Sequence, residues 1–63
     1  MTVRSDLEKA VASAESAKGT YLVAAQSTQD ETAKQKYEEM ATSMESHVSY
    51  LSSRLDYLNS TNL

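Results

Sequence analysis

His47 is the only histidine in the 63-residue chain, and it lies two residues after Glu45. Helical bundles hold pairs of iron or manganese ions with inward carboxylates and Glu-x-x-His pairs, whose two ligands lie three residues apart. Residues two apart on a helix point about 200° away from each other, so Glu45 and His47 cannot chelate one ion. A Glu-x-x-His pair would need Glu at the position of Met44. The sequence therefore argues against a metal site.

The other residue types that carry out catalysis do not form a recognisable catalytic motif in this chain. One histidine among many serines defines no Ser-His-Asp geometry. The chain has a single glycine, so it holds no glycine-rich phosphate loop, and it has no cysteine to form a thiolate metal site or a disulfide. We therefore expect no enzymatic activity and no cofactor.

One cluster of side chains is better suited to binding another protein. A polar aromatic stripe recurs at helical spacing in the second half of the chain, beside a row that contains Leu51 and Leu58, and consists of His47, Tyr50, Arg54 and Tyr57. Tyr and Arg are enriched at the energetic centres of interfaces. The same pattern also fits a half-exposed flank of a helix that packs within one chain. The interface hypothesis comprises His47, Tyr50, Leu51, Arg54, Tyr57 and Leu58.

Two long helices are expected to position these side chains. The chain has no proline and is rich in Ala, Glu, Lys, Gln and Leu, all of which favour helix. Apolar residues recur with the alternating spacing of three and four residues that is typical of coiled coils. In the first half the rows are Val3, Ala10, Ala17 and Ala24, and Leu7, Ala14, Tyr21 and Thr28. In the second half they are Tyr37, Met44, Leu51 and Leu58, and Ala41, Val48 and Leu55, with Met40 completing the stripe.

The rows of the two halves are out of phase, which requires a break between them. Nine residues separate Thr28 from Tyr37, so one continuous helix could not keep both rows on one face. The segment from Thr28 to Glu31 also matches the Ser/Thr-x-x-Glu capping box of a helix start. The sequence therefore predicts one all-α domain over residues 1–63, an antiparallel two-helix hairpin. Its expected parts are a helix over about 3–26, a turn over about 27–29 and a helix over about 29–59.

In this hairpin the residue numbers of facing positions add up to about 58, which places small residues of the first helix against large ones of the second. Gly19 opens an alternative, because glycine costs about 1 kcal/mol relative to alanine inside a helix and often follows a helix end. A first helix that ends there, with Thr20 capping a short second one, therefore remains open. The apolar rows continue in phase through Gly19, which favours a single helix.

A chain this short buries only about 60% of its unfolded surface, so it needs a partner for stability. The apolar stripe of the second helix is also wider than one helix contact requires. We expect a homodimer in which two hairpins form a four-helix bundle, with an unknown protein partner as a further possibility. The function expected is that of a non-enzymatic structural or interaction protein. The alternative is a metal or small-ligand carrier, a ferritin-like half-bundle.

Charge and hydropathy exclude other classes of partner. The net charge of -3 lies in the second half, and no run of Lys or Arg is present to bind phosphates, so nucleic acid is not an expected partner. No stretch approaches the roughly 18 apolar residues of a membrane span. Charged residues also occupy the first ten positions, where a signal peptide needs an apolar core. We therefore expect no membrane insertion and a cytoplasmic location.

Three segments, "MTV", "STQDETAKQKYEEM" and "LSSRLDYL", resemble the small bacterial family catalogued as domain of unknown function 1657 (DUF1657), which is found mainly in spore-forming bacteria. The likeness covers nearly the whole chain. Arg4 stands where members of the family usually have glycine, and the acidic, proline-containing tail that is common there is absent. The resemblance implies a small helical protein associated with sporulation, with no established activity and no functional residues to transfer.

Overall fold

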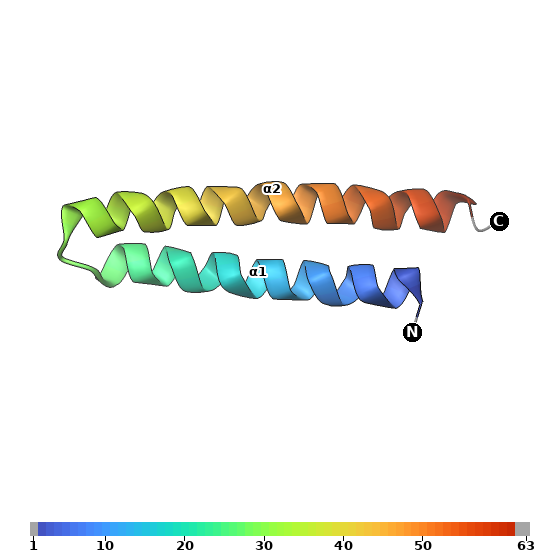
Figure 1. Ribbon diagram of the computed structural model, residues 1–63, viewed down its shortest axis with the longest axis horizontal. Coiled ribbons are helices and arrows are strands. Elements are labelled where there is room, and N and C mark those ends of the chain that lie inside the picture. Colours follow the sequence, from blue (N-terminus) through green and yellow to red (C-terminus); the bar gives the residue numbers. More distant parts are fainter. Residues whose placement is uncertain (1, 62–63) are drawn as a thin grey trace.

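The computed structural model describes residues 2–61, and it contains two α-helices that pack side by side (Figure 1). Helix α1 spans Val3–Ser27 and helix α2 spans Glu31–Thr61. The chain turns back at one end of the molecule, so the helices are antiparallel and both termini lie at the other end. This confirms the all-α hairpin. The molecule is elongated, with extents of 51 × 18 × 11 Å.

Helix α1 begins at a capping box made by Thr2 and Ser5. The Ser5 amide donates to Thr2 Oγ1 at 3.0 Å, and the Thr2 amide donates to Ser5 Oγ at 3.2 Å. Each hydroxyl thus satisfies a backbone donor that the first turn of a helix leaves without a partner. At the other end, Thr28 adopts an extended backbone with ψ of 143°, which ends the helix.

The turn comprises residues 28–30, and the predicted capping box at Thr28 and Glu31 is wrong. The Thr28 hydroxyl accepts from the Asp30 amide at 3.1 Å instead of capping the helix. Asp30 Oδ1 accepts from the amides of Thr32 and Ala33 at 3.0 and 3.2 Å, so Asp30 is the N-cap of α2. A carboxylate beside the positive end of the helix dipole binds amides more strongly than a hydroxyl does, which explains why Asp30 takes this position.

We expect Asp30→Ala to lower the free energy of unfolding by about 1 kcal/mol, because two amides of the first turn lose their acceptor. Urea denaturation followed by circular dichroism measures the change. Gln29→Ala is the matched control, since Gln29 is an exposed residue of the same turn and is not the cap. Equal stability of the two variants would contradict the assignment of Asp30 as the cap.

Gly19 lies inside α1 and does not end it, so the alternative of a helix end at this position is wrong. The residue is exposed, and a Cβ atom added to it would meet no other atom within 4 Å. The glycine therefore answers no packing requirement in the hairpin. Ala17 and Tyr21 on either side of it are half-buried against α2, and tertiary contacts of this kind override a single unfavourable residue.

The core between the helices is thin and consists of alanine. Within residues 2–61 the buried hydrophobic residues are Ala14, Ala25 and Ala41, which are 8%, 4% and 4% exposed, and no large side chain is fully buried. Alanines at the contact let the two helix backbones approach closely. The larger apolar side chains border this line and are half-buried. On α2 they are Tyr37, Met44, Val48, Leu51, Leu55 and Leu58, as the spacing predicted.

Two residues predicted to lie in the contact are exposed instead. Val3 was expected to face Leu55, but 68% of it is exposed. Met40 was expected to complete the stripe opposite Ala17, but 42% of it is exposed. Val3 lies in the first turn of α1, at the open end of the hairpin, and Met40 lies on the flank of α2 beyond the line through Ala41. A two-helix contact covers one stripe on each helix and leaves such flanks in solvent.

Candidate interaction surface

A groove of about 580 Å³ lies between the helices on one face of the hairpin. Small residues of α1 form one wall, and larger residues of α2 form the other. The difference in size between the two walls creates the hollow, since alanine and serine side chains fill little of the space beside α2. The lining residues are Ala10, Ser13 and Ala14 on α1, and Met44, Ser46, His47, Tyr50 and Leu51 on α2.

The polar aromatic stripe of α2, which comprises His47, Tyr50, Arg54 and Tyr57, borders this groove at one end. His47 and Tyr50 line it, and 64% of Tyr50 is exposed. Further along the helix, the Arg54 guanidinium lies over the Tyr57 ring, with its Cζ atom 4.8 Å from the ring centroid. This cation–π contact keeps the charge of Arg54 close to an aromatic face that is itself 54% exposed. Arg54 and Tyr57 therefore contact each other within α2, and all four residues of the stripe are exposed to solvent.

The six residues of the interface hypothesis thus fall into two groups. His47, Tyr50, Arg54 and Tyr57 are exposed, as a surface for another protein requires, while Leu51 and Leu58 are half-buried beside the contact with α1. Leu51 lies beside the contact with α1 and also lines the groove. Whether these residues bind a partner stays a prediction.

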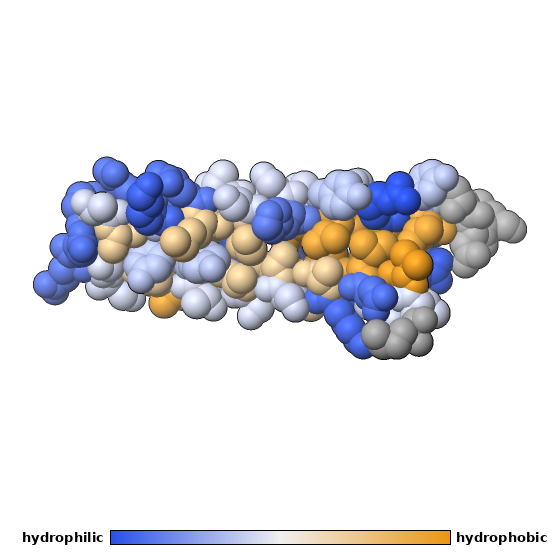
Figure 2. Space-filling view, viewed as in Figure 1, coloured by the Kyte–Doolittle hydropathy of each residue, from blue (hydrophilic) through white to orange (hydrophobic). Residues whose placement is uncertain are grey.

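Apolar surface gathers on one face of the hairpin (Figure 2). Most of the strongly hydrophobic surface, in orange, lies between the two helices toward the end that holds the termini, and hydrophilic residues cover the end with the turn. A gathering of this kind rimmed by polar residues is typical of a protein interaction site.

The sequence model of the family described as "Protein of unknown function (DUF1657)" matches residues 7–55. The chain belongs to this family. The matched segment contains the turn and every residue that lines the groove. No curated protein and no solved structure matches the chain.

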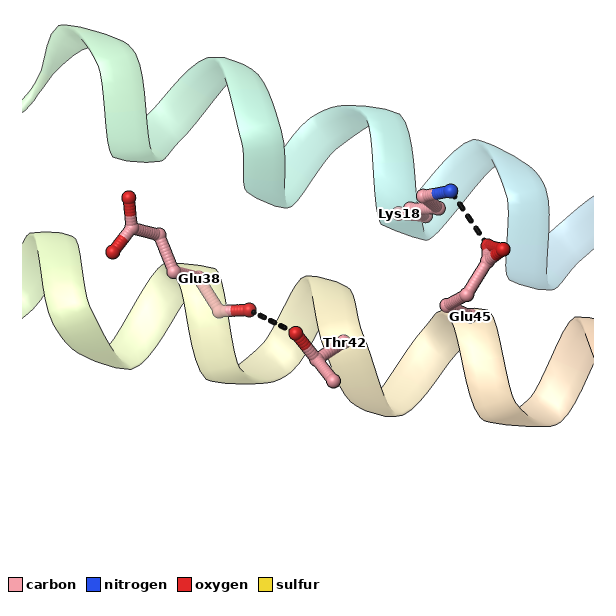
Figure 3. A network of polar contacts seen from close by, with 4 residues as sticks. All are labelled: Lys18, Glu38, Thr42 and Glu45. Atoms are coloured by element: carbon pink, nitrogen blue, oxygen red, sulfur yellow. Dashed lines mark hydrogen bonds and ion pairs between the residues drawn. The ribbon is translucent and has the colours of Figure 1, made fainter.

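An ion pair joins the two helices on the flank of this DUF1657 hairpin that carries Lys18 (Figure 3). Lys18 Nζ lies 2.6 Å from Glu45 Oε2 and joins α1 to α2, while the Thr42 hydroxyl donates to the Glu38 carbonyl one turn earlier in α2. The Lys18 and Glu45 side chains are 35% and 55% exposed. A pair this accessible to water contributes less than about 1 kcal/mol.

One row of α1 that faces α2 was not predicted from the sequence. Ala25 is 4% exposed, and Arg4, Val11 and Lys18 of the same heptad row are half-buried. Two of the four residues are cationic, so their spacing does not form an apolar heptad row in the sequence. Lys and Arg bury their aliphatic stems against apolar surface while the charged group stays near water. The apolar residues Val11 and Ala25, two heptads apart on this row, were the available signal in the sequence.

Within residues 2–61, no group of three or more His, Asp or Glu side chains lies close enough together to hold a metal ion. No helix of the described part of the chain combines the length and the apolar character that crossing a bilayer requires. A second hollow, of about 390 Å³, is bordered by Gln35, Glu38, Glu39 and Thr42, which are all exposed.

Proposed function

We propose that this DUF1657 hairpin is a non-enzymatic structural protein that acts by self-association, with two copies forming a four-helix bundle. The observation that carries the proposal is the exposure of large apolar side chains along one stripe of α2, where Met40, Tyr50 and Tyr57 are 42%, 64% and 54% exposed. A second hairpin placed on this stripe would remove it from water.

The overall surface area supports the same conclusion. The hairpin exposes 4630 Å², whereas a compact folded monomer of its mass is expected to expose about 4,000 Å². The excess arises because two helices form a rod with a single line of contact. Four-helix bundles remove it by giving each helix two neighbours instead of one. Buried apolar area stabilises by about 25 cal/mol per Å², so association adds stability that the alanine core lacks.

Sedimentation equilibrium tests the proposal. We expect a mass of twice the chain mass at tens of micromolar and a shift toward the monomer on dilution. The Tm measured by circular dichroism should rise with protein concentration, since association stabilises only the folded chain. A monomer at every concentration, with a constant Tm, would contradict the proposal.

The biological setting is a further part of the proposal. We propose the cytoplasm, or the spore, as the place of action, which rests on the resemblance to a family of spore formers. The alternative function of a metal or small-ligand carrier has a direct test in elemental analysis of the purified protein. Stoichiometric iron, manganese or zinc would reverse the ranking of the two functions.

A further inference from the structure

We infer that the second copy packs with its α2 on α1 of the first, with both turns at the same end of the bundle. This inference rests on the self-association proposed above and specifies its geometry. It starts from two rows of exposed and half-buried residues with alternating spacings of three and four, the spacing of a helix contact. The α1 outer row is Val3, Asp6, Ala10, Ser13, Ala17 and Thr20, and the α2 outer row is Met40, Ser43, His47, Tyr50, Arg54 and Tyr57.

The two outer rows contain most of the large hydrophobic residues that the hairpin leaves exposed. Six large hydrophobic residues are exposed in the described part of the chain, and four of them, Val3, Met40, Tyr50 and Tyr57, belong to these rows. All six residues of the α2 outer row are exposed. A partner that covers these rows would therefore bury most of the exposed large hydrophobic residues of the hairpin.

Both rows lie on the same face of the hairpin. Ala10 and Ser13 of the α1 outer row line the groove from one side, and His47 and Tyr50 of the α2 outer row line it from the other. When two identical faces meet about a two-fold axis parallel to the helices, each α1 lies opposite the α2 of the other copy. Small residues then face large ones, and the groove of each hairpin receives His47 and Tyr50 of the other.

The spacing of the two rows matches residue by residue. In each facing pair the two residue numbers add up to 60. Within one hairpin the facing residue numbers add up to about 58. The two sums are close because a two-fold axis parallel to the helices does not shift one copy along the other. The helices in contact are antiparallel, so the alternating spacings coincide along the whole row. The pairs are Val3 with Tyr57, Asp6 with Arg54, Ala10 with Tyr50, Ser13 with His47, Ala17 with Ser43 and Thr20 with Met40.

Charge supports this arrangement over its main competitor. Asp6 is the only carboxylate in the two rows and Arg54 the only Lys or Arg, and the register places them opposite each other. Opposite charges across an interface fix register and suppress other pairings. A perpendicular two-fold axis would place α2 on α2 and α1 on α1, so that large residues meet large ones and Asp6 meets no cation of the α2 outer row.

A charge exchange between two chains tests the geometry. Arg54→Glu gives a chain with two acids at these positions, and Asp6→Arg gives a chain with two bases. We expect each variant alone to dimerise about tenfold more weakly than the parent, since both cross-subunit pairs become repulsive. An equimolar mixture should form a heterodimer of near-parental affinity, because both pairs are then attractive.

The controls separate this geometry from self-association in general. Glu15→Arg changes an exposed acid outside the α1 outer row, so mixing it with Arg54→Glu should not restore affinity. A parent dimer whose variants show no recovery on mixing would overturn the geometry and leave self-association intact. A monomeric parent would overturn both.

Cysteine cross-linking gives a second measurement that needs no charge change. The chain has no cysteine of its own, and Ala17→Cys and Ser43→Cys are small changes at a predicted facing pair. Mixing these two variants under mild oxidation should give a heterodimer as the main disulfide product. Preferential cross-linking of Ser43→Cys with Arg54→Cys would indicate α2 on α2 and would overturn the proposal.

Discussion

Replacing Ala41 with Glu is expected to unfold most of the protein. Ala41 is 4% exposed at the contact between the helices, where a carboxylate would be buried without a partner or would force the helices apart. An uncompensated buried charge costs on the order of 3 to 5 kcal/mol. A domain of this size has a total stability of about 3 to 9 kcal/mol, so the loss removes much or all of it.

Circular dichroism at 222 nm and urea denaturation measure the effect. Ala12→Glu is the matched control, because it makes the same change at an exposed position of α1. Ala and Glu both favour helix, so the two variants differ in burial rather than in helix propensity. A stable, fully helical Ala41→Glu variant would show that the helices do not pack along the alanine line.

Leu51→Ala is expected to lower the free energy of unfolding by about 2 kcal/mol and to weaken dimerisation as well. Leu51 is half-buried beside α1 and also lines the groove, so its removal leaves a cavity in one chain and takes away a contact of the second copy. The estimate lies at the low end for Leu→Ala because the residue is not fully buried. Urea denaturation and sedimentation equilibrium measure the two effects separately.

Two comparison variants make the Leu51 result interpretable. Leu22→Ala is the same change at a residue that is 42% exposed and lies outside the groove, so its effect on both measurements should be smaller. Tyr50→Ala removes a side chain that is 64% exposed and should weaken dimerisation more than it destabilises the monomer. If Leu22→Ala and Leu51→Ala had equal effects, the half-buried row of α2 would not be part of the stabilising contact.

The sequence alone determined the two helices, their antiparallel order and the side of α2 that faces α1. These follow from local physics, because helix propensity and the spacing of Tyr37, Met44, Leu51 and Leu58 depend on residues close together in the chain. The phase break near Thr28 similarly required a turn, since one straight helix cannot present two rows that are out of phase.

Only the tertiary structure decided which of two nearby residues caps α2 and which of two adjacent alanines is buried. Thr28 and Asp30 both have acceptors suited to capping α2, and the path of the turn assigned the cap to Asp30. Ala24 and Ala25 are chemically identical, and the rotation of α1 against α2 buried Ala25 more deeply. Such choices depend on contacts between residues far apart in sequence, which a pattern along one helix does not contain.

The groove belongs to the same class of feature. Periodicity placed His47 and Tyr50 on a flank of α2, but the hollow exists because Ala10 and Ser13 of α1 lie across from them. Its shape depends on how two helix surfaces of different side-chain size are set against each other. The sequence therefore predicted which residues lie on this flank, and only the packing of α1 on α2 showed that they line a groove.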